Sequence, residues 1–363
     1  MDFDLSEDQL ALRDAAARFL DEQCPTTRVR AAMADDDAYD RDLWAAMVDL
    51  GWPGIAVPES MGGLGLGAVE LAVLLEQTGA HVAPTPFLQE ALTLVVLAAA
   101  ADRGIADAAW LDPVLLGDSA AAIAWQPVRA ERDGARWLLT GRTGPALYAP
   151  VADVVVVPGR EDDGAEHLFV ADARSRRIAA EPAMDQTRQL GWVDLDATPS
   201  LHLGEQDAAT AFADLGAVAH AAELLGAADR ALAMAVEYAK ERVQFGRPIG
   251  SFQAIKHRCA DMLVDVEGMR SAVYHAAWCI GAGDPDRSIA ASTAKTWCSD
   301  AGRRVMASAL QVHGGIGFTW EHDLHLYLKR AQLDEVSFGD ASFHRARLAA
   351  LLRERVERGE SVI

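Results

Sequence analysis

The side chains best suited to bind a dinucleotide lie within residues 241–253, ERVQFGRPIGSFQ. Arg242 carries a planar set of N–H donors that can bind two phosphate oxygens at once. Gln244 supplies an amide and Phe245 an aromatic face, which suit the ring of a cofactor. The same arginine can also complement the C-terminus of a helix, and the phenylalanine can belong to the core. This stretch alone leaves both interpretations open.

A second stretch with such chemistry spans residues 311–318, QVHGGIGF. Gly314 and Gly315 follow a helical pattern and can end the helix with a residue in the left-handed conformation. They can also leave backbone N–H groups open to a phosphate or an adenine, with the Gln311 amide beside them. Capping alone explains the glycines, but the pairing of the two stretches favours a cofactor site.

The elements that position the first stretch are two long helices. A helical pattern over residues 207–242 runs into it, and Gly246, Pro248 and Gly250 stop that pattern. Ser251 is expected to cap the next helix. Apolar positions cover most of the helix surface within residues 211–238, which predicts a helix buried in a bundle. The other C-terminal helices are expected over residues 251–280, 287–312, 323–333 and 341–358.

The first part of the chain is also predicted to be helical. Ser6 and Gln9 have the spacing of a capping box that opens an amphipathic helix. Further helices fit residues 43–50, 69–78 and 89–101. From Leu115 on, short apolar or alternating runs are separated by Gly, Asp and Pro, which is typical of an antiparallel β barrel or a small sandwich. These runs are residues 120–125, 137–140, 151–157, 167–170 and 201–203.

Together these patterns predict an α+β fold that is mostly α. The N-terminal helical domain is expected over residues 1–113, the middle antiparallel β domain over residues 114–205, and the C-terminal four-helix bundle over residues 206–363. A chain of 363 residues, 51% of them hydrophobic, can bury a large core and build two or three such parts.

The composition excludes several classes of partner. A formal net charge of −21 argues against binding to nucleic acids or anionic membranes, because both attract basic patches. The acidic N-terminus is unlike a signal peptide, and the apolar run at residues 92–101 is too short to span a bilayer. The four cysteines show neither CxxC nor Cys/His metal spacing. We therefore expect a cytoplasmic protein without a metal site.

In its motifs the chain resembles the acyl-CoA dehydrogenase family, flavoenzymes that form the α,β-double bond of acyl-CoA thioesters. The resemblance covers essentially the whole chain, and the predicted domain order is that of the family. It is carried by residues 3–9 (FDLSEDQ), 50–59 (LGWPGIAVPE), 62–67 (GGLGLG), 242–246 (RVQFG) with Phe252 and Gln253, and Gln311 with residues 314–318 (GGIGF).

The C-terminal motifs imply a cofactor and a place for it. In the family they hold the pyrophosphate and adenosine part of an FAD that is bound mainly by the neighbouring subunit of a dimer. The resemblance therefore implies FAD as cofactor, shared across a subunit interface. On this chain it assigns the cofactor-binding residues Arg242, Gln244, Phe245, Phe252, Gln253, Gln311, Gly314 and Gly315.

The catalytic position departs from the family. The family's glutamate, which abstracts the α-proton, lies shortly before the last helix, where this chain has SFGD and Phe338 takes its place. A phenylalanine cannot accept a proton. Some members carry the base on the helix that leads to the arginine motif, but residues 215–220 have no carboxylate at the matching point. No catalytic residue is therefore expected, and solvated or helix N-terminal roles suit the nearby acids Asp340 and Glu335 better.

The β domain departs from the family as well. The family's TEPGxGSD-like loop, which contacts flavin and substrate, corresponds to residues 124–127 (AWQP) and lacks its glycine–serine part here. The family's strand against the flavin ring corresponds to residues 145–147, which contain no tryptophan. Tyr148 can offer a substitute aromatic face, although a loop tyrosine is the simpler interpretation.

The elements that a subunit uses on its own flavin and substrate are thus eroded, while those that serve a neighbour are present. We expect the non-catalytic subunit of a heteromeric acyl-CoA dehydrogenase, in a heterodimer or heterotetramer with a homologous catalytic subunit that holds the acyl-CoA. Within a family known for fatty-acid β-oxidation, members of this heteromeric type act on steroid CoA thioesters. Two alternatives stay open: a self-sufficient dehydrogenase with Asp340 as a relocated base, and a flavin-free interaction or regulatory protein.

Overall fold

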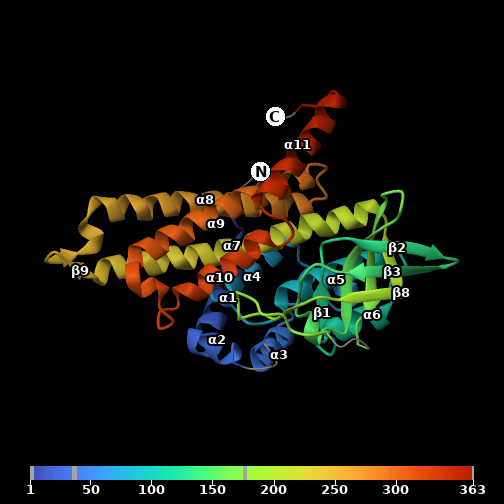
Figure 1. Ribbon diagram of the computed structural model, residues 1–363, viewed down its shortest axis with the longest axis horizontal. Coiled ribbons are helices and arrows are strands. Elements are labelled where there is room, and N and C mark those ends of the chain that lie inside the picture. The colour runs from blue at the N-terminus through green and yellow to red at the C-terminus, as the bar shows by residue number, and fades with distance from the viewer. Residues whose placement is uncertain (1–3, 35–38, 175–177, 362–363) are drawn as a thin grey trace. The chain divides into compact units, whose positions relative to one another are not determined.

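The computed structural model describes residues 4–34, 39–174 and 178–361 and shows a mostly helical chain (Figure 1), in which the strands of the β region follow the N-terminal helices and precede the C-terminal helices in sequence. This is the fold class that the sequence predicts. The chain divides into two compact units. One consists of Met1–Thr27, Ala72–Ala83 and Ala217–Ile363, and the other of Arg28–Leu71 and Pro84–Gly216.

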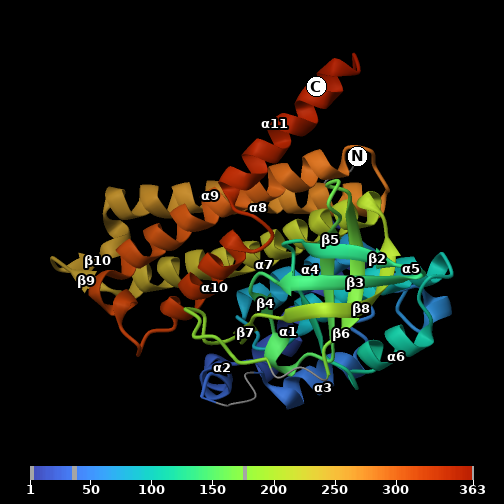
Figure 2. The ribbon, with the colours of Figure 1, turned by 45° about the vertical axis from the view of Figure 1, so that its right-hand side comes forward.

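The first unit is built on the C-terminal helical bundle. Figures 1 and 2 both show α7, α8 and α9 side by side, with α10 against the bundle. Every residue of α7 from 217 to 228 is buried, which confirms the prediction made from its apolar surface. The helices are α7 (Gln206–Glu241, residues 217–241 in this unit), α8 (Gln253–Gly281), α9 (Arg287–His313), α10 (Leu324–Val336) and α11 (Ala341–Glu357).

The start of α8 differs from the prediction. Phe252 precedes the helix and makes no side-chain cap, whereas Ser251 belongs to a 3₁₀ turn, η3 (Ile249–Ser251). The Ser251 hydroxyl donates to the Pro248 carbonyl at 2.7 Å. The prediction that Ser251 caps α8 is therefore wrong, because this hydroxyl already closes the turn before the helix.

Helix α1 (Glu7–Gln23) also belongs to the first unit and begins with the predicted capping box. The Gln9 backbone N–H donates to Ser6 Oγ at 3.2 Å, and the Ser6 backbone N–H donates to Gln9 Oε1 at 2.9 Å. Two otherwise unsatisfied donors at the helix start are thus satisfied reciprocally.

The C-terminal end of α4 (Ala68–Ala80) crosses α7 within the first unit at two glycines. A Cβ on Gly79 would lie 2.0 Å from the Glu223 carbonyl oxygen, and one on Gly226 would lie 1.8 Å from the Glu76 carbonyl oxygen. Any side chain at either position would push the two backbones apart. The crossing therefore depends on glycine in both helices.

The second unit holds the remaining helices. Helices α3 and α5 occupy the predicted places, whereas the sequence patterns predict neither α2 nor α6. Pro113 inside α6 and the two buried residues of the short α2 explain why these patterns are weak. The elements are α2 (Thr26–Ala32, in this unit from residue 28), α3 (Arg41–Asp49), the 3₁₀ turn η1 (Glu59–Met61), α5 (Phe87–Asp102) and α6 (Ala108–Leu115).

One eight-stranded sheet in the order β2-β3-β8-β6-β5-β1-β4-β7 forms the β region of the second unit. Strand β2 also pairs with β5, so that β2, β3, β8, β6 and β5 close into a barrel. Neighbours are antiparallel as predicted, apart from the parallel pairs β1–β5 and β2–β5. The strands are β1 (Ala121–Ile123), β2 (Val128–Asp133), β3 (Arg136–Arg142), β4 (Ala146–Leu147), β5 (Val154–Arg160), β6 (Glu166–Asp172), β7 (Leu190–Gly191) and β8 (Asp194–Gly204).

Among the helices of the described ranges, α7 is long and apolar enough to cross a membrane by length and composition. However, 89% of its apolar window is buried inside the structure. A buried apolar helix of this kind is typical of the core of a globular bundle.

Candidate functional site

The RVQFG motif forms a tight β-hairpin between α7 and α8. Strand β9 (Val243–Gln244) pairs with β10 (Arg247–Pro248), and Phe245 and Gly246 make the two-residue turn. Both turn residues have positive φ, 54° and 78°, as in a type I′ turn. Glycine adopts this backbone freely, but a phenylalanine there is strained.

Phe245 projects from this hairpin into solvent, with 92% of its surface exposed. Its ring meets the edge of the Phe252 ring at 6.1 Å, and the Arg247 guanidinium lies 4.2 Å above Phe252. An aromatic side chain that is both strained and exposed is not explained by packing in this chain. Strain of this kind is found at functional sites, where a ligand or partner gives the side chain its role.

The diglycine motif forms the turn after α9. The helix ends at His313, and a 3₁₀ turn, η4 (Gly314–Phe318), follows. Gly314 has φ 62° and ψ −140°, so the expected left-handed cap is wrong, although the φ value still requires glycine. A Cβ on Gly314 or Gly315 would meet no atom within 4 Å, so a ligand can approach this backbone closely.

Stacked rings bring the two motifs to one end of the bundle. Tyr238, four residues before Arg242, stacks on His313 with ring centroids 4.7 Å apart and an interplanar angle of 24°. Burial lowers the pKa of His313, which favours the neutral ring in this stack. The hairpin and η4 are therefore neighbours where α7 and α9 end and where α8 and α10 begin (Figures 1 and 2).

This end of the bundle is open to solvent in the single chain. Of the predicted cofactor-binding residues, Phe252 and Gly314 are half-buried and the other six are exposed: Arg242, Gln244, Phe245, Gln253, Gln311 and Gly315. Large apolar side chains surround them, and exposed apolar groups in such numbers mark a binding surface. They are Val243 (54% exposed), Ile316 (43%), Phe318 (74%) and Trp320 (58%).

These residues fit part of a dinucleotide, the group that the resemblance implies. An exposed guanidinium, two glycines with an unobstructed backbone, amides and an aromatic face are the donor set that a pyrophosphate and an adenosine require. Six of the eight predicted residues are exposed in the single chain. The geometry fits one side of a cofactor site.

Phe338 lies between α10 and α11 and is buried, with 4% of its surface exposed. Its φ is 55°, and its ring lies 5.5 Å from the His220 ring of α7. Its carbonyl oxygen accepts a hydrogen bond from His344 Nε2 at 2.8 Å. The side chain that the resemblance places at the position of the family's base is thus an apolar ring packed into the bundle.

A buried ionic network lies behind Phe338. Arg330 pairs with Glu223 at 3.1 Å, and His220 Nδ1 lies 3.0 Å from Asp334 Oδ1. The Lys295 ammonium donates to the carbonyl oxygens of Asp334 and Glu335 at the end of α10, and burial lowers the pKa of Lys295 to about 8. These contacts fix the last turn of α10, which leads into Phe338.

Three members of this network, His220, Glu223 and Asp334, bring donor atoms within 4.8 Å of one another, as in a metal site. However, the Arg330 guanidinium already compensates the charge of Glu223, and the His220 ring lies within hydrogen-bond distance of Asp334. An ion pair explains the cluster without a metal.

Asp340, the alternative base, caps a helix. Its carboxylate accepts a hydrogen bond from the Phe343 backbone N–H at 2.8 Å and begins α11. Glu335 forms an ion pair with Arg303. Asp340 therefore has the helix N-terminal role that suits it, whereas Glu335 is a partly buried partner in an ion pair.

Tyr148 in the β region is fully buried and does not present an exposed aromatic face. Its ring packs edge-on against Tyr39 at 6.0 Å, and its φ is 56°. This packing argues against Tyr148 as a substitute for the aromatic residue that contacts the flavin ring in the family.

The ionic network could not be predicted from the sequence, because its paired residues are far apart in the chain. Glu223 and Arg330 are separated by 107 residues, and His220 and Asp334 by 114. A local signal was nevertheless present. His220 and Glu223 are three residues apart, and Arg330 and Asp334 are four apart, so each pair lies on one helix face. Charged pairs at helical spacing within apolar patterns indicate partners in another helix.

Two family models match the chain: "acyl-CoA dehydrogenase, N-terminal domain" over residues 6–108 and "acyl-CoA dehydrogenase, C-terminal domain" over residues 206–352. The acyl-CoA dehydrogenase IpdE2 of Mycobacterium tuberculosis is 35% identical over 328 residues, which are 90% of this chain and 91% of that protein. A chain of the ChsE4–ChsE5 complex from Mycobacterium tuberculosis superposes with a TM-score of 0.88 at 31% identity, covering 98% of this chain and 99% of that one. A variant of the Tcur3481–Tcur3483 steroid ACAD gives 0.89 at 29% identity, covering 97% and 99%.

Proposed function

Because the chain belongs to the acyl-CoA dehydrogenase family, we propose that it is the non-catalytic subunit of a heteromeric member of that family. The family consists of oxidoreductases that use FAD. In this proposal the chain completes an FAD site that belongs mainly to a homologous catalytic subunit. The observation that carries it is the contrast between the exposed cofactor residues around Phe245 and the buried Phe338 at the place of the base.

The exposed end of the bundle would hold one side of the FAD. Arg242 would donate to the pyrophosphate, and the Gly314–Gly315 backbone with Gln311 would face the adenosine part. Gln244, Phe245, Phe252 and Gln253 would complete the contacts of the hairpin. FAD, when bound, supplies the two-electron oxidation of the acyl-CoA thioester. The role of this chain is to bind and orient the cofactor.

The chemistry near Phe338 supports a non-catalytic role. A buried phenylalanine cannot remove a proton, and the Asp340 carboxylate already accepts the bond that begins α11. The acyl-CoA would therefore lie on the partner, together with the base. The alternative of a self-sufficient enzyme with Asp340 as base would need this carboxylate to leave its capping position.

Two similar structures support a heteromeric partner. They come from the ChsE4–ChsE5 complex and from the Tcur3481–Tcur3483 steroid ACAD. We infer a heterodimer or heterotetramer of this kind, with a steroid or other bulky CoA thioester as substrate. With a net charge of −21, the chain would work in the cytoplasm without nucleic acid or membrane partners.

We also propose the domain boundaries that the patterns suggest, at residues 113/114 and 205/206. The two family models, which end at residue 108 and begin at residue 206, support them. The β region between them would then be the middle domain.

Co-expression of this chain with a homologous acyl-CoA dehydrogenase encoded beside it tests the proposal. The purified complex should contain about one FAD for each pair of chains, and this chain alone should purify without flavin. Arg242→Ala should raise the Kd of the complex for FAD at least tenfold and so lower its flavin content on purification, since a charged hydrogen-bonding partner of the pyrophosphate is worth about 1.5–3 kcal/mol.

Asp340→Asn is the matched control, because asparagine also caps a helix. It should leave turnover of the complex unchanged, whereas loss of turnover would favour the self-sufficient enzyme. A yellow homo-oligomer of this chain that oxidises acyl-CoA by itself would refute the proposal. Unchanged flavin content and activity after Arg242→Ala would favour the flavin-free interaction protein.

A further inference from the structure

His313, the last residue of α9, connects the two halves of the proposed cofactor surface. Tyr238 of α7 stacks on its ring, and the ring of His322, in the segment before α10, meets it at 4.6 Å and an angle of 62°. The diglycine turn begins at the next residue, and a Cβ on Gly317 of η4 would lie 3.1 Å from the His313 Cβ. The ring therefore links α7, which carries the hairpin, to the turn η4.

The hydrogen bonds of this ring cluster require both imidazoles to be neutral. The Ala309 carbonyl oxygen can only accept, so His313 Nδ1 carries a proton and donates to it at 2.8 Å. In the neutral ring His313 Nε2 then holds a lone pair. His322 Nδ1 also holds a lone pair, because it accepts the Leu324 backbone N–H at 3.1 Å where α10 begins.

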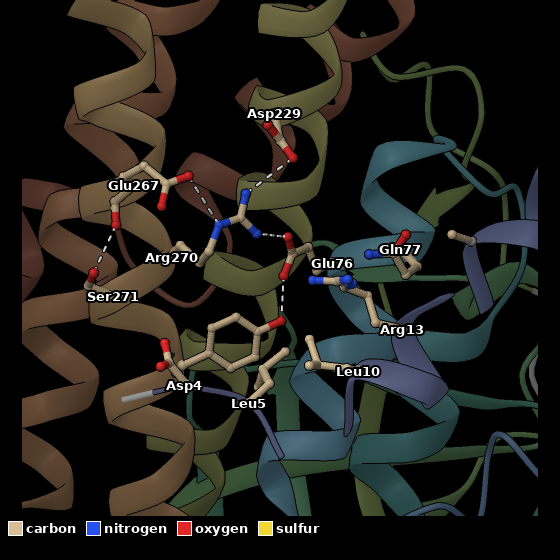
Figure 3. Close-up of a pocket in the computed structure, with 12 residues that line it drawn as sticks. Asp4, Leu5, Leu10, Arg13, Glu76, Gln77, Asp229, Glu267, Arg270 and Ser271 are labelled. Carbon is tan, nitrogen blue, oxygen red and sulfur yellow. Dashed lines mark hydrogen bonds and ion pairs between the residues drawn. The ribbon is translucent and has the colours of Figure 1, made fainter. Parts of the chain in front are cut away.

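His313 Nε2 has no hydrogen-bond partner among the residues that the structure describes, although the atom is buried and only 4% of the side chain is exposed. Elsewhere in the same unit a partly buried cation is compensated by carboxylates. Figure 3 shows Arg270 of α8 paired with Glu76, Asp229 and Glu267. A proton on His313 Nε2 would lack such a partner, and an uncompensated buried charge is costly.

The surroundings of the ring supply no compensation for this charge. Tyr238 faces it with the ring and His322 with an imidazole, and these are the titratable groups that contact it from α7 and from the segment before α10. Burial lowers the pKa of His313, the bond to the Ala309 carbonyl opposes this shift, and a charge on His322 lowers the pKa further. Acid therefore disfavours the packed arrangement.

We propose that His313 is a positioning residue whose neutral ring holds the diglycine turn beside the hairpin, and that its protonation opens this arrangement and releases FAD. The inference rests on the proposed function, because it concerns the same cofactor surface. In the opened turn the histidine would regain its ordinary pKa near 6.5. The Kd for FAD should then rise as the pH falls below about 6.5, by at most about tenfold per pH unit for one proton.

Titration of FAD into the complex with the catalytic subunit, at several pH values from about 8 to 5.5, tests this inference. The Kd of the wild type should rise severalfold, and at most about tenfold, from pH 7.5 to 5.5. His313→Phe keeps an aromatic ring for Tyr238 but cannot be protonated, so its Kd should be equal at both pH values. His344→Gln removes a buried histidine outside the cluster and is the matched control, in which the rise should persist.

His322→Asn separates the two imidazoles of the cluster. Asparagine still offers an acceptor to the Leu324 N–H and does not titrate, so the rise of Kd should persist in this variant as well. Loss of the rise in His322→Asn together with its persistence in His313→Phe would overturn the proposal. Tighter binding of FAD at low pH would also overturn it, because a protonated His313 would then attract the pyrophosphate. Far-UV circular dichroism at each pH shows that the proteins are folded.

Hydrogen exchange of this chain alone provides a measurement that does not depend on flavin. After correction for the intrinsic effect of pH, residues 242–252 and 314–318 should exchange faster at pH 5.5 than at pH 7.5 in the wild type but not in His313→Phe. Equal protection at both pH values in the wild type would refute the opening. A complex that binds FAD with a pH-independent Kd contradicts this inference alone, whereas a complex without FAD contradicts the proposed function.

Discussion

Phe245 combines two properties that rarely occur together, a positive φ and almost complete exposure to solvent. In an isolated chain this residue lowers stability, because asparagine or glycine would fit the turn better. Its presence is explained if its ring binds a cofactor that a second subunit holds. In that case the same residue would lower stability and support function.

Phe245→Asn should separate these effects. Asparagine tolerates the left-handed backbone, so the free energy of unfolding of the isolated chain should rise by about 1 kcal/mol. The flavin content of the complex should fall, because the aromatic face is lost. Urea unfolding and flavin absorbance measure the two results. A variant that is more stable and keeps all its flavin would contradict a role of this ring in cofactor binding.

His344 should make the stability of the chain depend on pH. Burial, together with the positive charges of Lys295 and Arg347, lowers the pKa of His344 to about 4, while the bond to the Phe338 carbonyl opposes this. Between pH 6.5 and 4 the unfolded chain therefore binds more protons at this ring than the folded chain, and stability falls as the pH is lowered.

His344→Gln removes this titration and keeps a side chain that can donate to the Phe338 carbonyl. The loss of stability from pH 6.5 to 4 should be smaller in this variant than in the wild type, as measured by urea unfolding at each pH. His257→Gln, at an exposed position of α8, is the control and should follow the wild type. Parallel curves for all three proteins would show that His344 does not contribute.

At the scale of the elements, two glycines are expected to matter for different reasons, one at the crossing of α4 and α7 and one in the turn η4. Gly226→Ala places a Cβ 1.8 Å from the Glu76 carbonyl oxygen, so α4 and α7 must separate. This should lower the free energy of unfolding by about 3 kcal/mol. Gly315→Ala meets no atom within 4 Å and should change the stability by less than about 0.5 kcal/mol.

The same pair separates folding from cofactor binding. Gly315→Ala should still lower the flavin content of the complex, because the added methyl group occupies space above an open backbone. Gly226→Ala should lower flavin only in proportion to the unfolded fraction. Chemical denaturation and flavin absorbance on both variants test this difference. Full flavin in Gly315→Ala would contradict a close approach of the cofactor to this turn.

Most of the elements could be predicted from the sequence because their signals are local. The long helices α7, α8 and α9 carry apolar patterns over many turns, and β5 and β6 are apolar runs between turn residues. The exposed hairpin at Phe245 was not predicted, since its turn has Phe-Gly in place of the usual Asn-Gly. Strand β2, with burial confined to Val128 and Ala130, lacks the apolar content that identifies a strand.

The sequence predicts which residues belong to the candidate site, but it does not predict how they are arranged in space. Arg242 and Gln311 are 69 residues apart in sequence, and the Tyr238–His313 stack shows that their helices end together. The exposed end of the bundle likewise depends on contacts between distant helices. Such contacts leave no pattern in one sequence, since neither partner has a fixed spacing to the other.

At the scale of the whole molecule, the exposed apolar groups beside η4 should become protected in the complex. Trp320 is 58% exposed, and the Lys329 ammonium lies 4.0 Å above its ring. In the isolated chain, acrylamide should quench its fluorescence. In the complex with the catalytic subunit this quenching should disappear, because the surface around the hairpin is then buried.

Trp320→Phe isolates this signal from the other eight tryptophans of the chain. The difference in quenching between wild type and variant should be clear for the single chain and small for the complex. An equal difference in both forms would place the partner on another surface.

The packing of Phe338 has a consequence for the history of the chain. Exchange of this residue for the glutamate of the family would put a carboxylate at a position with 4% exposure, beside a His220 ring that Asp334 already engages. A second buried acid there would stay protonated and would destabilise the bundle. Restoring a base by a single substitution at this position would therefore cost stability. If the chain is the non-catalytic subunit proposed above, its dependence on a second gene product is difficult to lose.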